Sequence, residues 1–113
     1  MDKKEIKRNY KQKIQQMGVY QIRNLANGKV FIGGSKNILA KFNAHTFTLE
    51  IGTHINKKLQ EEYNIFGKES FVFEVLETVK PKEDPAYDYS FDIKELEKKW
   101  LNKIKPTGEN GYN

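Results

Sequence analysis

The amino-acid sequence predicts an α+β fold: a small, mainly antiparallel sheet of three strands flanked by helices. Three observations lead to this class. Two segments rich in β-forming residues are separated by Asn27-Gly28, the strongest short signal for a hairpin turn. Segments with apolar residues at every third or fourth position surround a third β-rich segment. The 113 residues suffice for one domain with one core.

The chain begins with a predicted basic amphipathic helix at residues 1–16, which precedes a domain at residues 17–113. Ile6, Tyr10 and Ile14 lie at helical spacing and form an apolar stripe. Basic side chains cover the other faces and supply most of the net charge of +5: Lys3, Lys4, Lys7, Arg8, Lys11 and Lys13. Such a helix is either a solvated surface element or a contact for nucleic-acid phosphates, and charge alone leaves both interpretations open.

The predicted hairpin pairs strands at residues 18–24 and 29–33. A two-residue turn would place Tyr20 opposite Ser35, with residues 20, 22, 31, 33 and 35 on one face. Gly33 on that face would leave space beside Tyr20 for a phosphodiester. The glycine pair itself is too short for a phosphate-binding P-loop and is not in a parallel βαβ unit, so it is interpreted as a bend from strand into helix.

Two helices are predicted after the glycine pair. The first is capped by Ser35 or Asn37 and ends before Gly52. The second begins after Thr53 and ends at Gly67. The apolar stripe of the first helix consists of Ile38, Leu39, Phe42 and Leu49.

The third predicted strand lies within residues 70–79. It carries apolar residues on both faces, which favours a central position in the sheet. A loop with prolines and acidic residues follows, and a last helix at residues 92–104 carries Trp100 and ends before Pro106.

The composition excludes several classes of function. The chain has no cysteine and only two histidines, so disulfides, zinc-cysteine sites and thiol nucleophiles are excluded, and any metal is expected to bind oxygen ligands. No apolar run reaches the length of a signal-peptide core or a membrane span. We therefore expect a cytoplasmic protein that has no membrane partner.

Two short motifs on the hairpin indicate a family. "GVY" at residues 18–20 and "FIG" at residues 31–33 resemble the paired motifs of the GIY-YIG endonucleases. The resemblance continues along the next helix, where Lys41 stands at the position of the family's arginine. His45 and His54 match two histidines of the phage homing endonucleases in this family.

The C-terminal part resembles the same family. Glu97 and Trp100 reproduce a Glu-x-x-Trp context, and "GYN" at residues 111–113 matches the segment that closes the family's core. The resemblance implies these site residues: Tyr20, Phe31, Lys41, His45, His54, Glu97 and Asn113. It also implies nucleic-acid contacts through Lys36 and Lys41 besides the N-terminal basic residues, and structural roles for Gly18, Gly33, Gly34 and Trp100.

The resemblance further implies a mechanism. In the family a divalent metal, Mg²⁺ or Mn²⁺, is held by the residue matching Glu97, the second-motif tyrosine helps to activate water, and the arginine stabilises the charged transition state. Phe31 replaces that tyrosine, and loss of a general base typically lowers the rate about 10²–10⁴-fold. Lys41 keeps the arginine's charge without its planar fork of donors.

These departures leave open whether the chain is an enzyme. The preferred interpretation is a nucleic-acid-binding protein on a GIY-YIG fold, with phosphodiester cleavage impaired or lost. The alternative is a metal-dependent DNA endonuclease in which Tyr20 or one of the histidines replaces the base. A further alternative is a protein-interaction module. The expected partner is DNA, with RNA also open, and a protein partner could supply specificity.

Overall fold

The computed structural model describes residues 16–113. The predicted N-terminal helix, with Lys3, Lys4, Lys7, Arg8 and Lys11, lies outside the described residues. The elements follow in the order β1 (Gly18–Asn24), β2 (Val30–Ser35), α2 (Ile38–Ile51), α3 (Lys57–Phe66), η1 (Lys68–Ser70), β3 (Phe71–Thr78), α4 (Ser90–Ile104) and η2 (Gly108–Asn110). None of the described helices has the length and hydropathy needed to cross a membrane.

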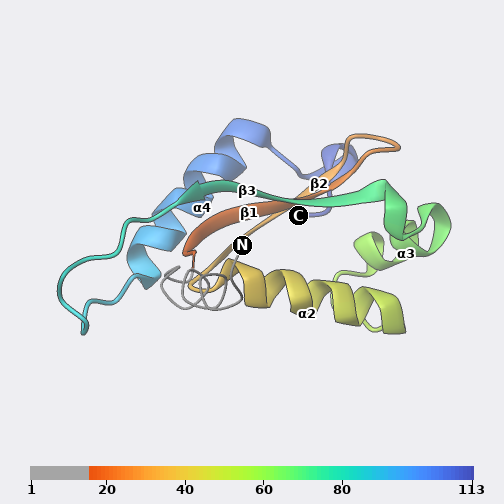
Figure 1. Ribbon diagram of the computed structural model, residues 1–113. Helices are drawn as coiled ribbons and strands as arrows, with labels where there is room; N and C mark the ends of the chain where they lie inside the picture. Colours follow the sequence, from red (N-terminus) through yellow and green to blue (C-terminus); the bar gives the residue numbers. More distant parts are fainter. Residues whose placement is uncertain (1–15) are drawn as a thin grey trace, which may run out of the picture.

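The three strands form an antiparallel sheet in the order β2-β1-β3, with α4 on one face and α2 and α3 on the other (Figure 1). This confirms the predicted fold class. The predicted central position of β3 is wrong, because β1 lies between the other two strands. Every residue of β3 is at least partly exposed. β3 nevertheless carries apolar residues on both faces, because Phe71 and Phe73 pack against the cluster under α2 and α3 and Leu76 packs against the cluster under α4.

In the hairpin, the residues predicted to share one face of the sheet do so, but the turn is longer than predicted. Tyr20 pairs with Gly33 rather than with Ser35. The loop has four residues, since Asn24 N–H donates to the carbonyl of Lys29 at 2.9 Å and Gly28 N–H donates to the carbonyl of Asn24 at 2.7 Å. The side chain of Asn24 accepts from the amide of Ala26, which stabilises the wider turn. The register shifts by two residues, so residues 20, 22, 31 and 33 still share one face.

The predicted helix boundaries are confirmed by their caps. Asn37 caps α2 through a bond from the amide of Ala40 to its side-chain oxygen, and Gly52 ends the helix with a positive φ of 81°. α3 ends at Gly67. Leu39 is 52% exposed and does not belong to the core, contrary to the predicted stripe.

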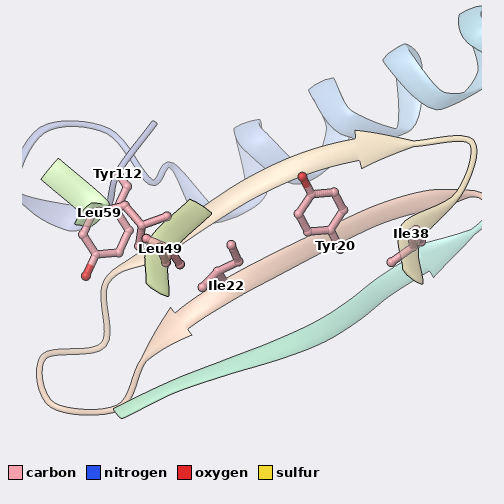
Figure 2. Packing of buried hydrophobic residues seen from close by; sticks show 6 residues of the cluster. All are labelled: Tyr20, Ile22, Ile38, Leu49, Leu59 and Tyr112. Atoms are coloured by element: carbon pink, nitrogen blue, oxygen red, sulfur yellow. The ribbon is translucent and has the colours of Figure 1, made fainter. Parts of the chain in front are cut away.

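Two apolar clusters lie on opposite faces of the sheet. The first, under α2 and α3, consists of Tyr20, Ile22, Ile38, Leu49, Leu59 and Tyr112 (Figure 2). The second, under α4, consists of Val19, Val30 and Ile32 with partly buried residues Leu76, Leu96, Trp100, Leu101 and Ile104. The "GYN" segment lies along the outer edge of β2, where Gly111 forms a parallel bridge with Val30.

Candidate active site

Tyr20 projects from the central strand across the glycine of the neighbouring strand. A Cβ on Gly33 would lie 2.6 Å from the Tyr20 hydroxyl, so only glycine leaves room for the ring. The predicted space for a phosphodiester at Gly33 is thus taken by the tyrosine ring itself. Phe42 of α2 packs edge-on against Tyr20, with the centroids 5.4 Å apart. Figure 2 shows the Tyr20 hydroxyl pointing toward β2.

A chain of hydrogen bonds leads away from the Tyr20 hydroxyl. Its oxygen lies 2.7 Å from Nε2 of His45, and Nδ1 of His45 lies 2.7 Å from Nε2 of His54. The backbone N–H of Asn56 donates to Nδ1 of His54 at 2.9 Å. The two imidazole rings lie edge to edge, with 22° between their planes and their centroids 5.0 Å apart, as a hydrogen bond between ring nitrogens requires. α2, the α2–α3 loop and the start of α3 therefore together orient one tyrosine of β1.

The backbone amide of Asn56 constrains which ring nitrogens in this hydrogen-bond chain carry a proton. Nδ1 of His54 accepts a hydrogen bond from the N–H of Asn56, so this nitrogen carries no proton. The neutral ring therefore has its proton on Nε2. That proton is donated to Nδ1 of His45, whose own proton is then on Nε2 and is donated to the Tyr20 oxygen. In this arrangement of protons the Tyr20 oxygen would accept from His45.

Burial keeps the side chains of this hydrogen-bond chain uncharged at physiological pH. It lowers the pKa of His45 to about 4, with His54 and the positive charge of Lys41 acting in the same direction. Burial also lowers the pKa of His54. The pKa of Tyr20 rises to about 12 through burial and the nearby carboxylate of Glu97. Both histidines are thus uncharged, and Tyr20 keeps its proton.

Two of the sequence-predicted residues lie beside this chain. Phe31 packs edge-on against His45, with centroids 5.5 Å apart, and presents only a phenyl ring to the site. Lys41 is exposed, one turn before the half-buried His45 on α2. Lys36 forms an exposed ion pair with Asp88 at 3.4 Å, so its charge is shared with the loop before α4.

Glu97 of α4 approaches the glycine pair of β2 from the opposite face of the sheet. A Cβ on Gly34 would lie 2.9 Å from Oε2 of Glu97 and 2.7 Å from Cγ2 of Ile93, so α4 packs directly on the glycine backbone. The ion pairs among residues 16–113 do not involve Glu97. Gly33 and Gly34 therefore bring Tyr20 and Glu97 together from opposite faces.

Within residues 16–113 no three carboxylates or histidines converge on one point to enclose a metal. Glu97 is the carboxylate at the glycine pair, and Mg²⁺ commonly binds one or two carboxylates while phosphate oxygens and waters complete its shell. A single carboxylate fits that ion where phosphate oxygens are also present. When bound, such a cation would polarise a phosphate oxygen.

Asn113 has a defined position. Its side-chain oxygen accepts from the amide of Ile32 and its side-chain nitrogen donates to the carbonyl of Ile32, both at 2.8 Å. The amide thus pairs with the edge of β2 next to Gly33, as a neighbouring strand would. Its place supports the shape of the site, while its predicted catalytic role stays a prediction.

Gly18 and Trp100 lie at contacts between neighbouring elements, and their predicted structural roles stay predictions. Gly18 has a φ of 150°, and a Cβ there would lie 2.1 Å from the carbonyl oxygen of Glu77, which allows β3 to approach β1 closely. Trp100 donates its indole N–H to Glu77 at 2.9 Å. Gly18 therefore brings β3 close to the central strand, and Trp100 joins α4 to β3.

Sequence reasoning missed the groups that support the histidines. Asn56 caps α3, donates to His54 and binds the carbonyl of Tyr112. Gln60 accepts from the amide of His54 at 3.0 Å, and Glu62 accepts from the Tyr112 hydroxyl at 2.9 Å. An asparagine just before a helix signals a cap, but the sequence has no signal for its contacts with distant segments.

The comparisons with known proteins agree with this geometry. The family model described as the GIY-YIG catalytic domain matches residues 16–113, and the chain belongs to this family. An intron-associated endonuclease 1 of Enterobacteria phage T4 is 36% identical over 99 residues, which cover 85% of this chain and 36% of the relative. The chain therefore spans little more than a third of that relative's length.

Two solved structures of the catalytic domain of the intron, or homing, endonuclease I-TevI resemble the fold. A mutant form superposes with a TM-score of 0.72 at 32% identity, covering 88% of this chain and 93% of that domain. The other superposes with a TM-score of 0.70 at 32% identity, covering 86% and 96%. The similarity is thus to nearly the whole of that catalytic domain.

Proposed function

We propose that this chain binds DNA at the site formed by Tyr20, Lys41 and Glu97, and that its phosphodiester cleavage is impaired. The relatives are named endonucleases, whose substrate is a nucleic-acid backbone. Lys41 is exposed and its charge acts on His45, the histidine bonded to Tyr20, so the site offers a cation and a hydroxyl group to a phosphate oxygen.

The observation that carries the proposal is the occupancy of all four imidazole nitrogens. Nδ1 and Nε2 of His45 contact His54 and Tyr20, while Nδ1 and Nε2 of His54 contact Asn56 and His45. A general base needs a free lone pair within reach of water. Neither histidine offers one, so neither replaces the tyrosine that is missing at Phe31.

A second candidate is an active endonuclease in which Tyr20 is the base. The bond from His45 to the Tyr20 oxygen favours it, because a donor at that position stabilises a phenolate. The raised pKa of Tyr20, about 12, opposes proton removal at neutral pH, although a cation near Glu97 would lower it. Mg²⁺ or Mn²⁺ is therefore part of this second candidate.

The cleavage test compares the natural chain with Phe31→Tyr/Lys41→Arg in a plasmid-nicking assay with Mg²⁺ or Mn²⁺. We expect the double variant to nick at least about 10²-fold faster, because it restores a base and the planar guanidinium. Adding Glu97→Ala to the double variant should remove the gain. Equal metal-dependent rates for the natural chain and the double variant would overturn the proposed impairment and favour Tyr20 as base.

The binding test measures the affinity of the natural chain for duplex DNA as a function of salt. Each phosphate contact contributes a slope of about −0.9 in log affinity against log salt. Lys41→Gln should make the slope shallower by the contribution of about one phosphate contact. Substitution by glutamine also tests the predicted contacts of the N-terminal basic residues: Lys3, Lys4, Lys7, Arg8 and Lys11. Salt-independent binding, or preference for an RNA competitor, would contradict the proposal for DNA.

A further inference from the structure

The hydrogen-bond chain that ends at Tyr20 begins at a backbone amide of the helix cap. We propose that Asn56 is a positioning residue: its N–H sets the direction of the chain through His54 and His45, so that the Tyr20 hydroxyl serves as a donor to a phosphate oxygen. The inference rests on the proposed function for the identity of that acceptor. The direction of the chain is a property of the protein alone.

The reverse direction is blocked at Asn56. In the reversed chain, Tyr20 would donate to Nε2 of His45, His45 would donate to Nε2 of His54, and Nδ1 of His54 would carry a proton. That proton would face the N–H of Asn56 across a distance of 2.9 Å between the nitrogens, donor against donor. One backbone group therefore selects one tautomer for each of the two rings.

The amide of Asn56 is held by its own side chain. Oδ1 accepts from the amide of Leu59 at 3.0 Å and caps α3, and Nδ2 donates to the carbonyl of Tyr112 at 2.7 Å. His54 is held separately, because its backbone N–H donates to Gln60 at 3.0 Å. The start of α3 and the C-terminal segment along β2 thus fix the donor that orients the rings.

The direction of the hydrogen-bond chain decides whether the Tyr20 hydroxyl is free to donate its proton. Its oxygen accepts from His45, and among residues 16–113 no other group is bonded to it. The hydroxyl lies over Gly33 of β2, next to Gly34, on which Glu97 of α4 packs. The positive charge of Lys41 acts on His45, the donor to Tyr20, whereas the charge that acts on Tyr20 itself is the carboxylate of Glu97.

Histidine tautomers give a direct test. Two-bond ¹H–¹⁵N spectra of the natural chain at pH 7.5 should show both rings protonated at Nε2 and unprotonated at Nδ1. A proton on Nδ1 of His54 in the natural chain would overturn the inference, and this measurement needs neither a variant nor DNA.

A pair of variants isolates the backbone group. Asn56→Ala removes the cap and the contact with Tyr112 but keeps the N–H. Asn56→Pro removes the same side-chain contacts and also the N–H, at a φ of −84°, a few degrees beyond the range of about −65 ± 15° that proline adopts. We expect the tautomers to persist in the alanine variant and the Nδ1-protonated form of His54 to appear in the proline variant. Identical spectra for the two folded variants would contradict the role of the amide.

DNA affinity gives the functional readout. Tyr20→Phe should weaken binding about tenfold in the Asn56→Ala background, as expected for loss of one hydrogen bond to a charged group. It should change little in the Asn56→Pro background, where Tyr20 donates to His45 instead. Equal losses in the two backgrounds would overturn the inference. Absent binding with the expected tautomers would overturn the proposed function and leave the direction of the chain intact.

Discussion

The two faces of the sheet are stabilised in different ways. The face under α4 is apolar, with Val19 and Ile32 almost fully buried. The face under α2 and α3 includes buried or half-buried polar groups, among them His54 and Gln60, each hydrogen-bonded. Apolar packing tolerates small movements, whereas a hydrogen-bond chain requires fixed distances and directions. The histidines that hold Tyr20 therefore lie on the face where side-chain orientation is specified most strictly.

The faces meet at the glycine pair of β2. Gly33 allows the approach of Tyr20 from one side, and Gly34 allows the approach of Ile93 and Glu97 from the other. The apolar face therefore does more than support the fold, since it also carries the proposed metal ligand. Substitutions on each face should separate stability from the orientation of the polar chain.

The largest effect is expected in the apolar cluster under α4. Ile32 is 1% exposed, so Ile32→Ala should lower the free energy of unfolding by about 2–5 kcal/mol through lost burial and a cavity. Urea titration measures this loss, and Ile32→Val is the matched control with a loss of about 1 kcal/mol. The histidine tautomers should stay unchanged in both variants. A change of tautomer in a folded Ile32 variant would show that the two faces are coupled.

The polar face should make stability depend on pH. The pKa of His45 is lowered to about 4, below its ordinary value of 6.5, so the unfolded chain binds more protons between these values and stability falls as pH falls. From pH 7 to pH 5 the natural chain should lose about 2 kcal/mol more than His45→Gln, at 1.36 kcal/mol per pKa unit. Urea titrations at both pH values measure the difference. Parallel losses in the two proteins would show that His45 titrates normally in the fold.

A smaller effect is expected for the polar contact under α4. Trp100→Phe keeps an aromatic ring but removes the indole N–H that donates to Glu77, which should lower stability by about 1 kcal/mol. Glu77→Gln keeps a side-chain oxygen as acceptor and should cost less than Trp100→Phe. Urea titration of the three proteins compares them. A larger loss in Glu77→Gln would mean that the carboxylate's contact with Lys99 matters more than the indole bond.

Several elements could be predicted because local chemistry determines them. β1 has the expected bounds Gly18–Asn24, and the helices begin and end at Asn37, Gly52 and Gly67, where short polar side chains or positive φ values stop the helical bonding. Paired motifs on a hairpin likewise indicated the family. The shared face of Tyr20 and Phe31 followed from strand alternation and survived the error in the turn.

Other features depend on partners distant in the sequence. The apolar pattern of β3 resembles that of a central strand because its side chains pack against the apolar clusters on both faces, and only the pairing order shows that β3 lies at the edge. The turn after Asn24 is widened by side-chain bonds, and Asn24 and Asn27 both contact Glu62 of α3. No local pattern specifies such contacts.

The same division applies to the candidate site. The sequence alone determined which side chains the site can use: Tyr20, a phenyl ring at Phe31, a lysine at residue 41, two histidines and Glu97. The tertiary structure alone decided what those side chains can do. Tautomers, pKa values and free lone pairs are set by neighbours in space, and here a backbone N–H at Asn56 sets the direction of a hydrogen-bond chain that spans 36 residues of sequence.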